Sequence, residues 1–110
     1  MLKVKSKVWL EKNNSLVLGD GRFRILQAID ETGSINKAAK KLDMSFRHAW
    51  SYIDSSEKTL GIKLIQREKG GRYGGGSRLT PRAKKLVQKL ARLNAEVKDF
   101  VDLRFRRIFT

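Results

Sequence analysis

The stretch SINKAAKKLDMSFRHAWSYIDSSEKTLG, residues 34–61, decides the fold. Apolar residues in its first part recur at i, i+3, i+4 and i+7, which predicts a short amphipathic helix over about residues 35–42, capped by Ser34. After a break at Asp43-Met44, the same spacing returns over residues 46–60, with Ser45 as the cap and Gly61 as the end. Two short helices joined by a tight turn are typical of a helix-turn-helix. The two apolar sets are Ile35, Ala38, Ala39 and Leu42, then Phe46, Ala49, Trp50 and Ile53.

The second of these helices must turn its apolar set inward, so that Arg47, His48, Ser51 and Asp54 face outward. Trp50 is expected in the core, because an indole there fills the space under the helix. Phe46 is open to two interpretations, since its spacing favours the core while a first-turn ring can also contact a thymine methyl. Arg47 has the fork geometry that binds a guanine edge in the major groove. The residues predicted to contact DNA are Ser45, Phe46, Arg47, His48 and Ser51 in this helix and Ser34, Asn36 and Lys37 in the first one.

A glycine-rich and cationic loop, QREKGGRYGGGSRLTP at residues 66–81, follows the helix pair. The segments on either side can pair as two antiparallel strands, which makes residues 63–80 a wing beside the helix-turn-helix. Glycines let such a loop lie flat against a DNA backbone, and its cations can meet phosphates or the minor groove; the alternative is a solubilising loop. The predicted wing contacts are Arg67, Lys69, Gly70, Gly71, Arg72, Tyr73, Gly74, Gly75, Gly76 and Arg78.

The N-terminal segment predicts a β-hairpin. Val4, Val8 and Leu10 alternate in KVKSKVWLEKN, as in a half-buried strand, and SLVL at residues 15–18 can return after an Asn-Asn turn. Asp20 is then a plausible cap for a helix over about residues 22–32 that closes at Gly33.

The final segment predicts one long helix over residues 81–108, capped by Thr80 with Pro81 at its first position. Its apolar residues step by four and three, as in a heptad seam. The seam can fold back on its own domain, but we expect a partner helix from a second copy, because so small a core cannot bury it. The predicted dimer contacts are Leu86, Leu90, Leu93, Val97 and Phe100.

Charge points to a polyanionic partner. The chain has 110 residues with 25 Lys plus Arg against 11 Asp plus Glu, a formal net charge of +14. Residues 62–92 hold ten of the cations and one acid, Glu68. A solvated surface of mixed signs would spread its charge more evenly, so we expect nucleic acid as the partner.

Other functional classes find little support in the residues. The chain has no cysteine, and the lone His48 makes a poor metal site. Neither a nucleophile constellation nor a paired acid and base is present, so we expect no enzyme, cofactor or metal. Since no apolar run approaches the roughly 20 residues of a membrane span, we expect a cytoplasmic protein.

These residues resemble a known family. GSI…AAK, the S-F-R-x-A-W motif and above all the GG-x-x-GGG…LT wing are similar to the N-terminal DNA-binding domain of the ModE family of molybdate-responsive regulators, and more distantly to LysR-type winged helices. The resemblance covers roughly residues 19–100. It implies a dimeric winged-helix transcription factor, with Ser45, Phe46 and Arg47 starting the recognition helix and the wing glycines on the DNA.

The sequence departs from that family in one respect. Full-length members carry C-terminal oxyanion-binding domains, whereas this chain ends at Thr110 and offers no evident effector pocket. It is then either a single-domain relative or a fragment. The expected fold class is mainly α with small β, a winged helix-turn-helix with an N-terminal hairpin and a long dimerisation helix in one domain. A sequence-specific regulator of double-stranded DNA is the leading hypothesis; an architectural or RNA-binding protein and a protein-interaction module are the rivals.

Overall fold

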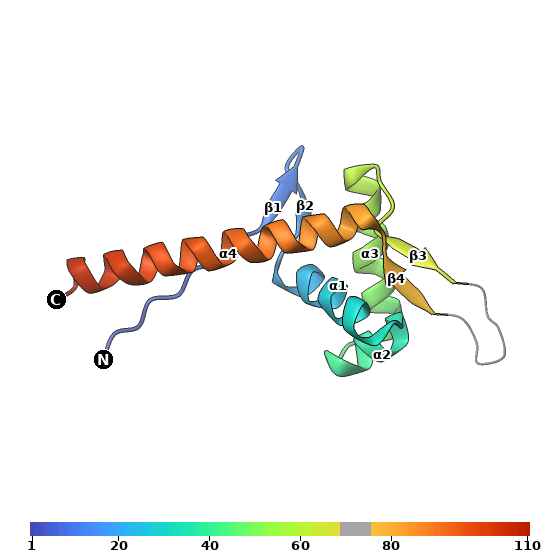
Figure 1. The fold of residues 1–110 in the computed structure, drawn as a ribbon, viewed down its shortest axis with the longest axis horizontal. Helices are drawn as coiled ribbons and strands as arrows, with labels where there is room; N and C mark the ends of the chain where they lie inside the picture. Colours follow the sequence, from blue (N-terminus) through green and yellow to red (C-terminus); the bar gives the residue numbers. More distant parts are fainter. Residues whose placement is uncertain (69–75) are drawn as a thin grey trace.

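A computed structural model of the chain describes residues 1–68 and 76–110. The predicted fold class, a winged helix-turn-helix with an N-terminal hairpin and a long last helix, is confirmed (Figure 1). The elements in chain order are β1 (Leu10–Lys12), β2 (Ser15–Leu18), α1 (Asp20–Thr32), α2 (Ile35–Lys41), α3 (Phe46–Leu60), β3 (Ile65–Arg67), β4 (Ser77–Leu79) and α4 (Pro81–Ile108). None of the helices in the described ranges is long and apolar enough to cross a bilayer.

Local signals place most of the helix ends. The hydroxyls of Ser34, Ser45 and Thr80 accept hydrogen bonds from the backbone N–H groups three residues on, which confirms all three predicted caps. Gly33 and Gly61 end α1 and α3 in the left-handed conformation that favours glycine. The predicted cap at Asp20 is wrong, because Asp20 already lies within α1 and Gly19 precedes the helix without a side-chain cap.

The first strand is much shorter than the sequence suggests. The expected strand from Val4 is wrong over most of its length, since β1 covers only Leu10–Lys12. Its partner β2 has four residues, so the chain before Leu10 has no neighbouring strand with which to pair. Asn13 and Asn14 form the turn with positive φ angles, as asparagine tolerates.

The core lies between α1, α2, α3, both small sheets and the first half of α4. It is built from aliphatic side chains of every element except β1 and β3, whose Leu10 and Ile65 pack against its edge. One buried hydroxyl, that of Ser56 in α3, donates to the carbonyl oxygen of Val17 in β2 and thereby ties α3 to the hairpin.

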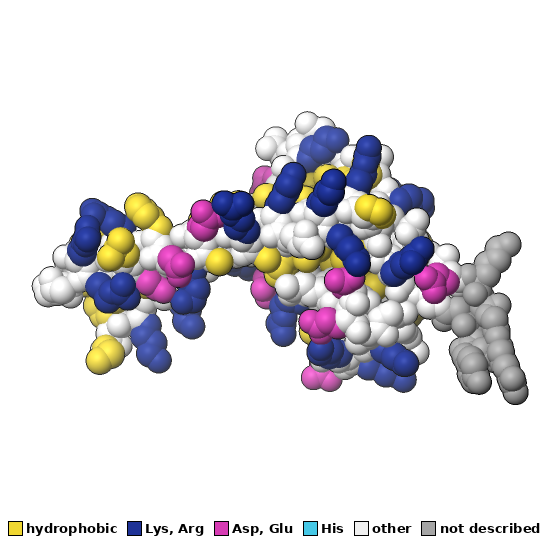
Figure 2. Space-filling view, in the orientation of Figure 1, with side chains coloured by type: hydrophobic (Ala, Val, Ile, Leu, Met, Phe, Trp, Pro, Cys, Tyr) yellow, Lys and Arg dark blue, Asp and Glu magenta, His cyan; other side chains and the backbone are white. Residues whose placement is uncertain are grey.

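The two halves of α4 have different environments. Ala83, Val87 and Leu90 in the first half are buried against the body, and Leu86 packs beside them. Leu90 is only 2% exposed within the single chain, so its predicted place in a dimer interface is wrong. The second half of α4 projects away from the other helices on the side where the N-terminal segment also runs, and hydrophobic side chains stand among charged ones on that end (Figures 1 and 2).

Candidate nucleic-acid interface

The N-terminal half of α3 presents an exposed face next to a rigid turn. The backbone N–H of Met44 donates to the carbonyl of Ala39 at 2.9 Å, and Asp43 takes a positive φ of 55°, so the chain reverses tightly between α2 and α3. The predicted contact residues of α3 are all exposed: Ser45, Phe46, Arg47, His48 and Ser51. From α2, Asn36 and Lys37 are exposed as well, whereas Ser34 is half-buried and its hydroxyl caps the helix.

Trp50 does not lie in the core, and that prediction is wrong. Its side chain is 43% exposed, and the inward positions of α3 are Ala49, Ile53 and Ser56. Small residues face each other where α2 meets α3, since Ala38, Ala39 and Ala49 are essentially inaccessible. Helices that meet through alanines approach closely and leave no space beneath for an indole, so the ring stays at the surface.

A network of contacts around Arg22 of α1 holds α3 in place. The Arg22 guanidinium donates to the carbonyl of Leu16 at 2.7 Å and reaches the hydroxyls of Ser56 and Ser55 at 3.3 and 3.4 Å. Its carbon centre lies 5.4 Å from the ring centroid of Tyr52. Tyr52 in turn meets the His48 imidazole edge-on, with centroids 4.5 Å apart. His48 is therefore held by its neighbours on the exposed face.

Sequence reasoning missed this network. Arg22 lies in α1, while its serine partners lie more than thirty residues away in α3. The adjacent pair Ser55-Ser56 in an otherwise amphipathic helix was the available signal, because neighbouring buried or half-buried hydroxyls need partners.

The base of the wing is attached to the corner between α1 and α2. Strands β3 and β4 pair antiparallel, with Gln66 opposite Arg78. The backbone N–H of Ser77 donates to the carbonyl of Gly33 at 2.9 Å, and a Cβ on Gly76 would lie only 2.8 Å from that oxygen. Gly76 therefore allows close contact between two backbone segments. The remaining predicted wing contacts lie outside the described residues: Lys69, Gly70, Gly71, Arg72, Tyr73, Gly74 and Gly75.

Acidic residues near α3 and the wing are matched by cations. Asp54 pairs with Lys58 at 2.9 Å, and Glu68 pairs with Arg78 at 3.4 Å. Glu57 accepts hydrogen bonds from the backbone of Leu64 and Ile65, and Lys63 lies 3.7 Å away. In the described part of the chain Lys37, Arg47 and Arg67 have no ion-pair partner, so their charge is available to an anionic ligand.

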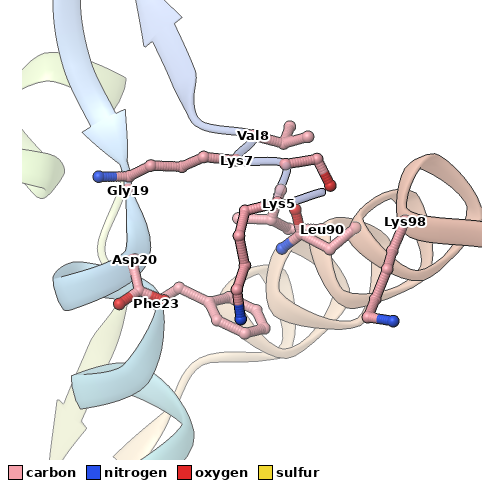
Figure 3. A pocket seen from close by; sticks show the side chains of 10 residues that line it. Lys5, Lys7, Val8, Gly19, Asp20, Phe23, Leu90 and Lys98 are labelled. Carbon is pink, nitrogen blue, oxygen red and sulfur yellow. The ribbon is translucent and has the colours of Figure 1, made fainter. Parts of the chain in front are cut away.

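A separate hollow of about 720 Å³ lies between the N-terminal segment, the start of α1 and the middle of α4 (Figure 3). Its apolar side is formed by Val8, Phe23 and Leu90. The amino groups of Lys5, Lys7 and Lys98 point in different directions and do not converge on a common point. Lys98 is also engaged by Asp102, whose hydrogen bond raises the pKa of Lys98 above its ordinary value. Such a hollow does not have the geometry of a site for a small anion.

Within residues 1–68 and 76–110 no group of three or more His, Asp or Glu side chains could hold a metal ion. Lys37 on α2, Arg47 at the exposed start of α3 and Arg67 on β3 lie on the helix-turn-helix and the attached wing strand. Their unpaired positive charge gives this part of the described structure a chemical preference for a polyanion.

Comparison with known proteins shows which family the chain belongs to. Residues 21–84 match the family of bacterial regulatory helix-turn-helix proteins, LysR family. The chain belongs to that family. Among solved structures, this LysR-type chain is similar to the CbnR DBD–DNA complex, with a TM-score of 0.64 at 22% identity over 84% of this chain and 100% of the other. The BenM DBD/catB site 1 DNA complex gives a TM-score of 0.60 at 29% identity over 78% and 90% of the two chains.

Curated relatives confirm the resemblance to ModE proteins. The molybdenum transport protein ModE of Azotobacter vinelandii is 35% identical over 97 residues, which cover 88% of this chain and 36% of that protein. The ModE protein of Herbaspirillum seropedicae is 42% identical over 77 residues, or 67% and 29% of the two chains. The LysR-type chain thus spans about a third of the length of these relatives.

Proposed function

We propose that this chain is a transcriptional regulator that binds double-stranded DNA sequence-specifically as a homodimer. The observation that carries the proposal is the exposed N-terminal half of α3, where Arg47 has no ion-pair partner among the described residues and stands beside a capped, rigid turn. In a helix-turn-helix this end of the second helix enters the major groove. The ModE protein of Haemophilus influenzae, named a transcriptional regulator, is 35% identical to this chain over 79 residues.

Base readout and backbone binding fall to different parts of this surface. Arg47 and Ser51 project from the middle of the exposed face, and a guanidinium can bind the O6 and N7 atoms of guanine in bidentate fashion. Arg67 and Arg78 on the wing strands, and Asn36 and Lys37 on α2, suit phosphates. For wing residues 69–75 we propose the same contact with phosphates, and only the glycine and cation content of the sequence supports it.

Dimerisation is proposed from the second half of α4. Leu93 is 42% exposed and Phe100 65% exposed, with Val97 half-buried between them. Apolar side chains that repeat along one projecting helix are stabilised when a second copy covers them. Leu86 lies nearer the body and would join the interface at its inner end. A DNA-binding regulator acts where the chromosome is, so we propose a cytoplasmic location.

Selection from a pool of random duplexes tests the proposed function. We expect the bound fraction to converge on a motif within a few rounds, and the motif to be an inverted repeat whose half-sites are separated by about one helical turn or a multiple of it. A bound fraction that keeps the random composition would contradict sequence-specific binding and would favour an architectural protein. A pool of single-stranded RNA, run in parallel, separates the RNA-binding alternative.

A further inference from the structure

Two adjoining hollows lie between α3 and the wing. Each has a volume of about 350 Å³, and Ile35 and Arg67 line both of them. We call this feature the α3–β3 groove. Its main wall residues are Ile35, Phe46, Trp50, Ile53, Ile65 and Arg67.

Two aromatic rings line the groove, and neither of them is buried in the core. Phe46 is 46% exposed and Trp50 is 43% exposed, and they lie one turn apart on the flank of α3 that faces the wing. Large aromatic rings left in water forgo the stabilisation that burial would give them. Phe46 lines one hollow and Trp50 the other, so both rings are accessible to a ligand in the groove.

The charges of the groove favour a ligand that is apolar in one part and anionic in another. The wall contains three acids, and each is already paired: Asp54 with Lys58 at 2.9 Å, Glu57 with Lys63 at 3.7 Å, and Glu68 with Arg78 at 3.4 Å. Arg67, by contrast, has no ion-pair partner in the described part of the chain and lies in both hollows. The groove thus combines an apolar wall with a single cation that is free to bind an anion.

We propose that one sugar–phosphate strand of a DNA duplex occupies the α3–β3 groove, with deoxyribose packed against Trp50 and Phe46 and a phosphate at Arg67. This rests on the proposed function. When α3 enters the major groove and the wing lies toward the neighbouring minor groove, the strand that separates the two grooves must cross between them. Deoxyribose presents C–H groups to the aromatic rings, and every nucleotide repeats it, so this contact positions the duplex without reading its sequence.

Fluorescence tests the position of Trp50 directly, since the chain has two tryptophans. Trp9→Phe leaves Trp50 as the only indole, and Trp50→Phe leaves Trp9, which immediately precedes β1 and donates to Glu11. Saturation is established independently by the anisotropy of a labelled random duplex. We expect saturating duplex to change the emission of Trp50 and to protect it from acrylamide, while Trp9 stays unaffected.

An unchanged Trp50 signal with duplex bound would overturn the groove assignment and leave the proposed function intact. Absence of duplex binding by the wild type and both variants would instead contradict the proposed function itself. A Trp50 that duplex leaves exposed but a protein partner protects would also overturn the assignment.

Affinity measurements test the chemistry of the contact. Trp50→Ala should weaken binding about tenfold, the factor that follows from uncovering roughly 50 Å² of apolar contact, equally on selected and random duplexes. Because no charge is lost, the slope of log K against log salt should not change, whereas Arg67→Ala should shallow that slope by about 0.9. Trp50→Leu, which keeps an apolar side chain, should lose less than Trp50→Ala.

A base contact would give the opposite pattern. If the loss on Trp50→Ala were confined to the selected site, or vanished when thymine was replaced by uracil, Trp50 would read a thymine methyl and the proposal would be wrong. Thermal unfolding of each variant excludes a folding defect, and the fluorescence experiment stands without removing the side chain.

Discussion

Arg47 combines three properties that few residues of this chain share. It lies at the second position of α3, it is exposed, and it has no acidic partner in the described structure. Its helix is held on one flank by the Arg22 network and at its start by the Ser45 cap, so the guanidinium projects from a helix whose position is fixed. A fixed helix reduces the entropy that is lost when the side chain binds the edge of a nucleobase.

Arg47→Ala should therefore lower affinity for the selected site by about 1–3 kcal/mol, and by much less for a random duplex. Arg47→Lys should restore little, because an ammonium cannot bind guanine in bidentate fashion. Lys58→Ala is the matched control, since Lys58 is exposed at the far end of the same helix and already paired with Asp54. Titration of each variant on both duplexes provides the measurement; equal losses on both would reduce Arg47 to a phosphate contact.

At this scale the sequence predicted what is local and failed on what is not. The serine and threonine caps depend on bonds that span three residues, so their prediction held. The exposure of Trp50 depends on how closely α2 approaches α3, and the role of Arg22 depends on serines in another helix. The spacing of apolar residues along one helix encodes neither the distance between α2 and α3 nor the distance from Arg22 to its serine partners.

Among the elements, the wing depends on a backbone junction that has no room for a side chain. Gly76 lies against the carbonyl of Gly33, and the neighbouring Ser77 N–H bonds to the same oxygen. This junction sets the angle at which β4 leaves the body and hence the direction of the wing relative to α3. Helix bounds followed from periodicity and caps, whereas β1 was overestimated because a strand needs a partner as well as a pattern.

Gly76→Ala should lower the free energy of unfolding by about 1–3 kcal/mol, since the new methyl group forces the two backbone segments apart. Thermal unfolding measures the change as a fall in Tm of several degrees. Ser77→Ala is the control, because it removes a side-chain hydroxyl and leaves the backbone bond to Gly33 intact. A Gly76→Ala protein as stable as the control would contradict the tight junction.

The whole molecule is elongated, with extents of 60 × 31 × 22 Å. The β3–β4 hairpin extends from one end and the second half of α4 from the other (Figure 1). Exposed apolar residues lie on the projecting part of α4, where Lys and Arg stand among them as they do over the body (Figure 2). The wing strands and the exposed apolar residues of α4 thus lie at opposite ends of the molecule.

Leu93→Asp combined with Val97→Asp should turn a dimer into a monomer with little effect on unfolding, because neither side chain belongs to the buried core. Two half-site contacts would then no longer act as one binding event, so affinity for the inverted repeat should fall by about 10²-fold or more. Light scattering and titration measure mass and affinity. Gln88→Asp with Ala95→Asp adds the same charge on the other face of α4 as the control. A wild type that is monomeric at micromolar concentration would contradict the dimer.

The most direct test of the account compares the dissociation constants of the wild-type chain for the selected duplex and for a scrambled duplex of the same length and base composition. Both titrations are made at one salt concentration, because phosphate contacts make each affinity depend on salt. Readout through α3 predicts that the selected duplex binds about 10³-fold more tightly or better. Equal affinity for the two duplexes would contradict sequence-specific recognition, however tightly both are bound.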